Sequence, residues 1–165
     1  MTIRPIAINE LNDWWDSIIK QNSGNDTWVS WKKSFVEENI SGKRKTFFAF
    51  DNSNQYIGQC TLLFEGRNKN MTGGGKAEII KLEVIENMRG KGISSMLYNE
   101  AKRYAKEKGV HTLTIGVEPK EVRNMQIYFH WGFTNFVECV TETYPPPNKN
   151  EKGETVTVIG YSQQI

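Results

Sequence analysis

The sequence predicts a mixed α/β fold (α+β) in which a mostly antiparallel central sheet of about seven strands is flanked by four helices. Two observations carry this prediction. Segments rich in β-forming residues and segments with apolar residues at helical spacing follow one another in the order β-α-α-β-β-β-α-β-α-β-β. Short or polar connections join the earlier strands and favour antiparallel pairing, whereas the strand-helix-strand unit after them favours one parallel, right-handed pair.

Length and composition favour a single domain over residues 1–165. Of the 165 residues, 38% are hydrophobic, so one core can be buried without disulfides or metals. The 21 Lys and Arg nearly cancel the 19 Asp and Glu, which argues against bulk electrostatic binding to nucleic acid or to an anionic membrane. Cys60 and Cys139 have no second Cys or His at metal-ligand spacing. With no signal-like or membrane-spanning apolar run, we expect a soluble cytoplasmic protein without a metal.

The first part of the chain predicts one strand and two helices. Residues 2–7 alternate enough for a short strand, and Asn9 is expected to cap the helix after it. A second helix is expected over about residues 28–40, with Ser41 and Gly42 ending it. Four tryptophans in these helices are interpreted mainly as core residues: Trp14, Trp15, Trp28 and Trp31.

Three strands are expected next. Residues 46–50 and 56–64 are rich in β-formers and are separated by a turn-forming segment, which predicts a hairpin. A glycine-rich loop then leads into a third strand over residues 77–85. Simple alternation in this strand predicts one face with Glu78, Ile80, Leu82 and Val84 and the other with Ile79, Lys81 and Glu83.

The remaining elements alternate between helix and strand. Residues 92–108 have the clearest helical spacing, and Gly109 is suited to the position just after the helix. The segment 144–153 contains three consecutive prolines and predicts a long loop. The other expected elements are a strand over 110–117, a helix over 121–131, a strand over 133–142 and a last strand near 155–161.

The turn before the longest helix has the character of an anion site. Gly90 and Gly92 let the backbone turn tightly with its N–H groups unscreened, and the helix start adds the positive end of its dipole. Arg89 and Lys91 add positive charge at the rim. A pyrophosphate would suit this turn, although glycines that only shape a connection, beside solvated cations, explain the segment in isolation equally well. No P-loop or dinucleotide-binding glycine pattern is present.

Two segments together resemble the GNAT superfamily of N-acetyltransferases. Leu82-Glu83-Val84 followed by Arg89-Gly90-Lys91-Gly92-Ile93-Ser94 is similar to its motif A, a Leu-x-Val strand that leads through Arg-Gly-x-Gly-Ile-Gly into a helix. Ser94 replaces the usual glycine or alanine but keeps its backbone N–H. Tyr128-Phe129-His130-Trp131-Gly132-Phe133 is similar to the family's Tyr-x-x-x-Gly-Phe ending. The resemblance covers about residues 77–136 well and the rest only through element order.

The resemblance implies a GNAT-like fold and acetyl-CoA as co-substrate. Asn124 shares a helix face with Tyr128 and is a further candidate, although relatives usually have alanine there, and Glu121 stands where many have a helix-starting Asn. The expected cofactor-binding residues are Leu82, Val84, Arg89, Gly90, Lys91, Gly92, Ile93, Ser94, Ser95 and Asn124.

The resemblance also implies catalytic roles. The thioester is expected beside Val84, where the strand separates from its parallel neighbour and the N–H of Val84 or Ile85 is available to polarise the carbonyl. Tyr128 resembles the family's general acid for the departing thiolate; a core aromatic residue is the alternative. Glu78 and Glu83 are candidate bases for the acceptor amine, and a solvated carboxylate is the alternative for Glu78.

The expected reaction is acetyl transfer to a primary amine of a small molecule, such as a polyamine, amino acid or amino sugar, by direct transfer in a ternary complex. The alternatives are a protein or peptide N-acetyltransferase and a non-catalytic acyl-CoA-binding module. One or two of the early tryptophans, and the 144–153 loop, are candidates for an acceptor site. His111 and His130 are interpreted as structural. A homodimer is left open, and no nucleic-acid or membrane partner is expected.

Overall fold

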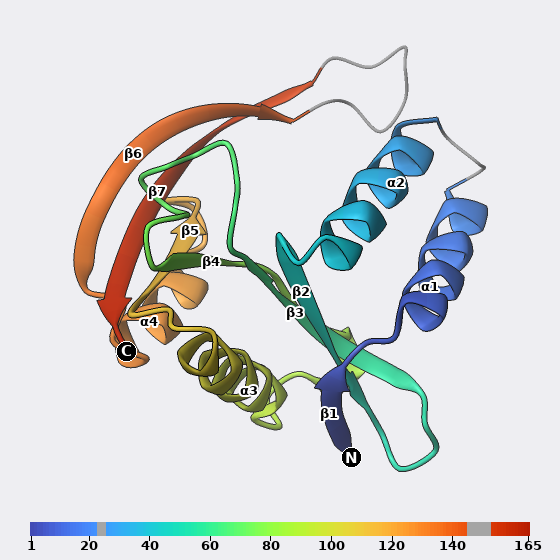
Figure 1. Ribbon diagram of the computed structural model, residues 1–165. Helices are drawn as coiled ribbons and strands as arrows, with labels where there is room; N and C mark the ends of the chain where they lie inside the picture. Colours follow the sequence, from blue (N-terminus) through green and yellow to red (C-terminus); the bar gives the residue numbers. More distant parts are fainter. Residues whose placement is uncertain (23–25, 145–152) are drawn as a thin grey trace.

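The computed structural model describes residues 1–22, 26–144 and 153–165 and shows one mixed sheet with helices on both faces (Figure 1). The strands lie in the order β1-β2-β3-β4-β5-β7-β6. The strands are β1 Thr2–Pro5, β2 Arg44–Phe50, β3 Tyr56–Leu63, β4 Lys76–Val84, β5 Thr112–Val117, β6 Asn135–Tyr144 and β7 Glu154–Gln164. The helices are α1 Ile8–Gln21, α2 Asp26–Ile40, α3 Ile93–Glu107 and α4 Val122–His130, with a 3₁₀ turn η1 at Glu86–Met88.

The sheet is antiparallel except at its centre, which confirms the predicted fold class. β4 and β5 pair in parallel across the α3 crossover, and the other neighbouring strands run antiparallel. The parallel pairing runs from Lys76↔Thr112 to Ile79↔Ile115 and goes no further, although both strands continue. β4 and β5 therefore separate toward their carboxyl ends, as the family resemblance implied.

Two apolar clusters attach the helices to opposite faces of the sheet. Side chains alternate along β2, so Phe47 contributes to the core beneath α3, whereas Phe48 packs with α1 and α2. Both rings are at most 2% exposed, and burying such a side chain contributes about 1.5–3 kcal/mol. Figure 1 shows α1 and α2 on one side of β2 and β3, and α3 on the other.

The element order is as predicted, with shifts at the boundaries. Asn9 lies inside α1 rather than capping it, because α1 begins at Ile8 and the carboxylate of Glu10 accepts a hydrogen bond from the N–H of Ala7 (3.3 Å). β7 extends to Gln164, beyond the expected end, because Gln164 still pairs with Thr112 on β5. Most of the expected 144–153 loop lies outside the described residues.

Simple alternation fails in β4, because this strand contains a bulge. Lys81 has a φ of 51°, and the pairing with β3 shifts register between Gln59↔Glu83 and Thr61↔Ile80. One extra residue reverses the alternation after it. Leu82 and Val84 therefore pack into the α3-side core with Ile79, and Glu83 shares the opposite face with Glu78. The prediction that Glu78 shares a face with Leu82 and Val84, and Glu83 with Ile79, was wrong.

Candidate active site

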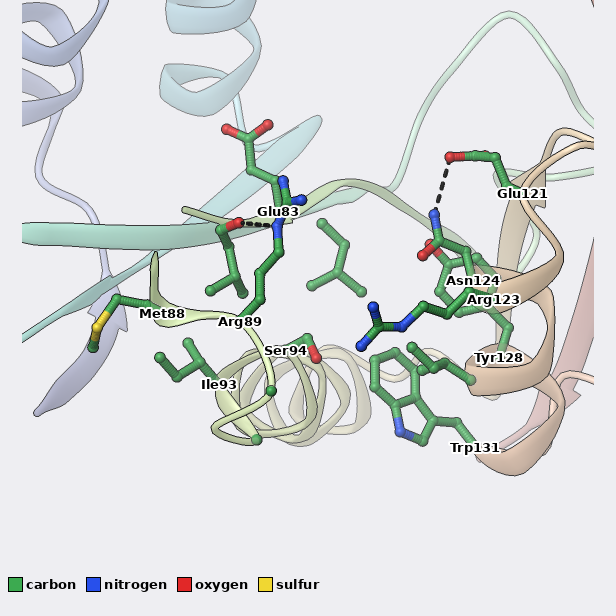
Figure 2. Close-up of a pocket in the computed structure, with 15 residues that line it drawn as sticks. Glu83, Met88, Arg89, Ile93, Ser94, Glu121, Arg123, Asn124, Tyr128 and Trp131 are labelled. Atoms are coloured by element: carbon green, nitrogen blue, oxygen red, sulfur yellow. Dashed lines mark hydrogen bonds between the residues drawn. The ribbon is translucent and has the colours of Figure 1, made fainter. Parts of the chain in front are cut away.

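A cavity of about 500 Å³ lies where the end of β4, the turn into α3 and the helix α4 meet (Figure 2). β4 supplies one wall, the glycine turn the second, and α4 the third. Its lining residues are Leu82, Glu83, Val84, Met88, Arg89, Gly90, Gly92, Ile93, Ser94, Glu121, Arg123, Asn124, Ile127, Tyr128 and Trp131.

The glycine turn is built so that backbone donors face outward. Gly90 and Gly92 have φ values of 78° and 77°, in the left-handed region that glycine adopts without strain. Gly92 caps α3, and the first intrahelical bond runs from the N–H of Met96 to the carbonyl of Gly92 (3.1 Å). The N–H groups of residues 93–95 therefore have no partner within the helix. This arrangement, with the positive end of the α3 dipole behind it, fits a phosphate or pyrophosphate.

Three cations lie at or near the turn, and they differ in what they contact. Arg89 donates from Nε to the carbonyl of Val84 (3.0 Å) and so ties the turn to the end of β4. Lys91 contacts the sulfur of Met88 (3.2 Å) and does not line the cavity. Arg123 was missed by the sequence analysis; Figure 2 shows it reaching from α4 toward α3. Its only signal in the sequence was its position directly before the candidate Asn124.

The structure brings most of the predicted cofactor residues together. Lys91 and Ser95 belong to the turn but do not line the cavity. The predicted residues that do are Leu82, Val84, Arg89, Gly90, Gly92, Ile93, Ser94 and Asn124. The lining residues that sequence analysis did not propose are Met88, Glu121, Arg123, Ile127 and Trp131. Trp131 lies within the Tyr-x-x-x-Gly-Phe segment, so the motif itself was the signal for it.

Tyr128 faces the cavity from α4 in largely buried surroundings. Its ring centroid lies 5.9 Å from that of Trp131 and 6.5 Å from that of Phe133. Burial, with smaller contributions from the nearby Glu121 and Cys60, raises the pKa of Tyr128 to about 12. The phenol therefore keeps its proton at neutral pH, as a proton donor must.

Asn124 lines the cavity one turn before Tyr128 but is already engaged. Its Nδ2 donates to Oε1 of Glu121 (3.0 Å), and Glu121 is the residue that precedes α4. The other carboxylate oxygen of Glu121 accepts from the N–H of Glu118 (3.3 Å). The side chain at the family's usual Asn position thus orients Asn124 along the cavity wall.

The end of β4 offers one backbone donor, not two. The N–H of Ile85 donates to the carbonyl of Ile57 on β3 (3.1 Å), so the expectation that Ile85 could polarise a thioester carbonyl was wrong. Because successive N–H groups of a strand point to opposite edges, the N–H of Val84 is directed to the other edge. That edge faces the gap that opens after Ile79 and Ile115.

Glu78 and Glu83 lie on the same face of β4 in different environments. Burial, together with the charges of Glu142 and Glu138 and against the opposing charge of Arg44, raises the pKa of Glu78 to about 7. Glu78 is half-buried rather than freely solvated, and it does not line the cavity. Glu83 does line it, and Figure 2 shows its carboxylate directed away from α3.

The early tryptophans pack with one another and with the sheet. Trp15 is 2% exposed and lies in the α1–α2 core, where its ring contacts those of Trp28 and Phe35. Trp14 is half-buried, with its ring centroid 5.9 Å from that of Tyr56. Core packing therefore explains most of them, as expected. Neither His111 nor His130 lines the cavity.

Residues 1–22, 26–144 and 153–165 hold neither a candidate metal site nor a helix that could span a membrane. No group of three or more His, Cys, Asp or Glu in these ranges is placed to hold a metal ion. None of the helices in this part of the chain is long and apolar enough to cross a membrane.

Comparison with known proteins identifies the family. The acetyltransferase (GNAT) family matches residues 9–133. The chain belongs to the GNAT family of acetyltransferases. The family uses acetyl-CoA as its co-substrate, and the glycine turn with its outward N–H groups fits the pyrophosphate of that molecule. No curated protein matches this chain significantly.

Solved acetyltransferases share the fold along the whole chain. An IAA acetyltransferase from Bacillus cereus is 19% identical, with 99% of both chains covered and a TM-score of 0.68. A ribosomal-protein-alanine N-acetyltransferase from Brucella melitensis is 17% identical, with 100% of both chains covered and a TM-score of 0.67. A spermidine N-acetyltransferase chimera from Vibrio cholerae and hSSAT is 16% identical, covering 99% of this chain and 96% of that one, with a TM-score of 0.66. These enzymes are named for different acceptors, so the shared fold does not select one.

Proposed function

We propose that this GNAT acetyltransferase transfers the acetyl group of acetyl-CoA to a primary amine of a small molecule, directly and within a ternary complex. One observation carries the proposal. A single cavity connects the glycine turn, the Val84 edge of β4 and the phenol of Tyr128, and Glu83 borders the same cavity from the other face of the sheet. A phosphate-binding turn, a proton donor and a candidate base are thus in one place.

Separate parts of the cavity serve binding. The N–H groups at the start of α3, with Arg89 at the rim, would hold the pyrophosphate of acetyl-CoA. The exposed edge of β4 at Leu82 and Val84 would hold the extended arm of the molecule. When bound, acetyl-CoA supplies the thioester, and the Val84 N–H is the backbone donor best placed to stabilise negative charge on its carbonyl oxygen.

The proton transfers are assigned to two side chains of this chain, a carboxylate and Tyr128. An alkylamine has a pKa near about 10 and reaches the enzyme mostly as ammonium, so a carboxylate, Glu78 or Glu83, must first take one proton. The amine nitrogen then bonds to the acetyl carbon while the carbon–sulfur bond breaks. Tyr128 donates its proton to the departing thiolate and recovers one from the nitrogen that has become an amide, directly or through water.

A cationic small amine is the acceptor that the charges favour. Glu78, on the same face of β4 as Glu83, lies near the carboxylates of Glu138 and Glu142 on β6. Such a concentration of negative charge attracts ammonium groups. We also keep the single domain over residues 1–165 as a proposal, supported by the sheet that joins residue 2 to residue 164. The cytoplasmic location and the homodimer stay predictions.

The first experiment is calorimetric titration with acetyl-CoA. We compare wild type with Gly92→Asp, because Asp tolerates a positive φ and would place a carboxylate where the pyrophosphate should bind. Gly109→Asp is the matched control: Gly109 has the same φ of 77° and open space around it, but lies just after the other end of α3. We expect micromolar binding by wild type and Gly109→Asp, and at least about a tenfold loss for Gly92→Asp.

The outcomes separate the candidate functions. No binding by a folded wild type would contradict the proposal at its root. Binding without release of free CoA thiol for any amine in a panel of spermidine, lysine, glucosamine and short peptides would favour an acyl-CoA-binding module. Release with peptides alone would favour a peptide acetyltransferase.

A further inference from the structure

Glu83 is held by two side chains from the neighbouring strand. Gln59 lies directly opposite Glu83 in the β3–β4 pairing and donates from Nε2 to Oε1 of Glu83. Tyr56 donates from its hydroxyl to the same oxygen (3.1 Å). Neither Gln59 nor Tyr56 lines the cavity, and the sequence analysis proposed neither. Both hydrogen bonds fall on Oε1, so Oε2 is the oxygen left to act on another molecule.

The bulge at Lys81 is what makes this contact possible. Without the extra residue, alternation would turn position 83 into the α3-side core, away from Gln59 and Tyr56. With it, Glu83 borders the cavity and also reaches the face covered by α1 and α2. Glu78 lies on that face too, but it does not line the cavity.

Gln59 keeps this contact at a cost in stability. Its side chain is 1% exposed, and within the described residues its Oε1 has no hydrogen-bond partner. Leaving a buried acceptor unpaired destabilises the folded chain. Turning the amide over would not remove the problem, because it would set the acceptor against the carboxylate of Glu83. Stability alone therefore does not explain a glutamine here, whereas holding Glu83 does.

Tyr56 is itself fixed and stays protonated. Its ring centroid lies 4.9 Å from that of Phe48 and 5.9 Å from that of Trp14, so α1 and the sheet clamp it from two sides. Burial, together with the charge of Glu83, raises the pKa of Tyr56 above its usual range. Its hydroxyl remains a donor to Glu83 across the whole pH range in which the enzyme can be assayed.

We propose that Gln59 and Tyr56 are positioning residues that hold Glu83 as the carboxylate that receives the acceptor's ammonium group, which assigns the base role to Glu83 rather than Glu78. The proton moves from the ammonium nitrogen to Oε2 of Glu83, leaving a neutral amine and a neutral carboxyl, and the carboxyl later returns that proton to solvent. The inference rests on the proposed function. It adds which carboxylate acts and what orients it.

The test is a double-mutant cycle on the full-length protein. Gln59→Met keeps the volume and removes the amide, Tyr56→Phe removes only the hydroxyl, and Glu83→Gln removes the base. Thr61→Val is the matched control, because Thr61 is also a buried polar residue of β3 whose hydroxyl bonds to Thr46 (3.1 Å) and not to Glu83. The readouts are kcat and KM with the fastest of spermidine, lysine and glucosamine, the affinity for acetyl-CoA, and Tm.

We expect Gln59→Met to lower kcat about tenfold, with acetyl-CoA affinity within about twofold and Tm unchanged or raised. In the Glu83→Gln background the same substitution should change kcat less than about twofold, because its target is gone. Thr61→Val should retain wild-type kcat. If Gln59→Met does not fold, the cycle with Tyr56→Phe gives the same comparison.

Two results would overturn the inference: undiminished kcat in Gln59→Met, or an equal loss with and without Glu83. Either one, with wild type releasing CoA normally, leaves the proposed function standing. Wild type that releases no CoA with any amine fails at the earlier step, before the role of Gln59 is reached.

Discussion

The two sides of the cavity differ in whether backbone groups or side chains face it. The side toward α3 presents mainly backbone: the glycine turn, the first N–H groups of α3 and the N–H of Val84. The side toward α1 and α2 presents side chains, with Glu83 held by Gln59 and Tyr56. Backbone donors suit a co-substrate that the whole family shares. Side chains can vary without disturbing the fold, which suits an acceptor that differs between enzymes.

Removing the hydroxyl of Tyr128 should have the largest effect, since it lies where the two sides meet. We expect Tyr128→Phe to lower kcat at least about tenfold, because the thiolate would depart without its proton donor. Affinity for acetyl-CoA should stay within about twofold in calorimetry. Tyr104→Phe is the control, because Tyr104 is a partly buried tyrosine of α3 outside the cavity. An unchanged kcat in Tyr128→Phe would show that Tyr128 is a core aromatic residue and not the proton donor.

Glu78, on the face of β4 that also carries Glu83, should make the stability of the fold depend on pH. The folded chain raises the pKa of Glu78 from 4.5 to about 7, so it binds the proton more tightly than the unfolded chain. Stability should therefore fall as pH rises through this window. We expect Tm curves of wild type and Glu78→Gln to run together below pH 4.5 and to separate by several degrees above pH 7, with the variant more stable. Parallel curves over the whole range would contradict this account of Glu78.

The bulge should respond to substitution by a smaller amount. Lys81 adopts a φ of 51°, which glycine tolerates and β-branched residues do not. We expect Lys81→Gly to change the free energy of unfolding by less than about 1 kcal/mol, and Lys81→Val to destabilise by about 1–2 kcal/mol. Urea unfolding measures both. Equal stability of the two variants would show that the left-handed conformation at position 81 is not retained.

The same contrast explains what the sequence could predict. The glycine turn was predictable because Gly90 and Gly92 mark a positive φ in the sequence itself, and helical spacing then locates α3. The bulge was not, because lysine carries no turn signal, and so the faces of Glu78 and Glu83 were assigned by an alternation that the chain interrupts. Gln59 was missed for a related reason. It meets Glu83 only through strand pairing, and a pairing shifted by a bulge cannot be read from local pattern.

Asn9 and Ile85 show the same limit on a smaller scale. Asn9 has the side chain of a good N-cap, but Glu10 reaches back to Ala7, which caps the helix two residues earlier. The position of Ile85 at the end of a strand suggested a free backbone donor, but its N–H donates to the carbonyl of Ile57. In each case the local preference was real, and a contact elsewhere in the chain decided the outcome.

The extra residue in β4 also bears on how such a site can change. A substitution alters one side chain, whereas gaining or losing one residue at position 81 exchanges the two faces for everything between it and the glycine turn. A relative without the extra residue would direct the middle side chain of its Leu-x-Val segment into the core beneath α3, and its base would have to come from another position. With Glu83 in the proposed role of base, chain length at this point, as much as the identity of any residue, sets which carboxylate this enzyme offers its acceptor.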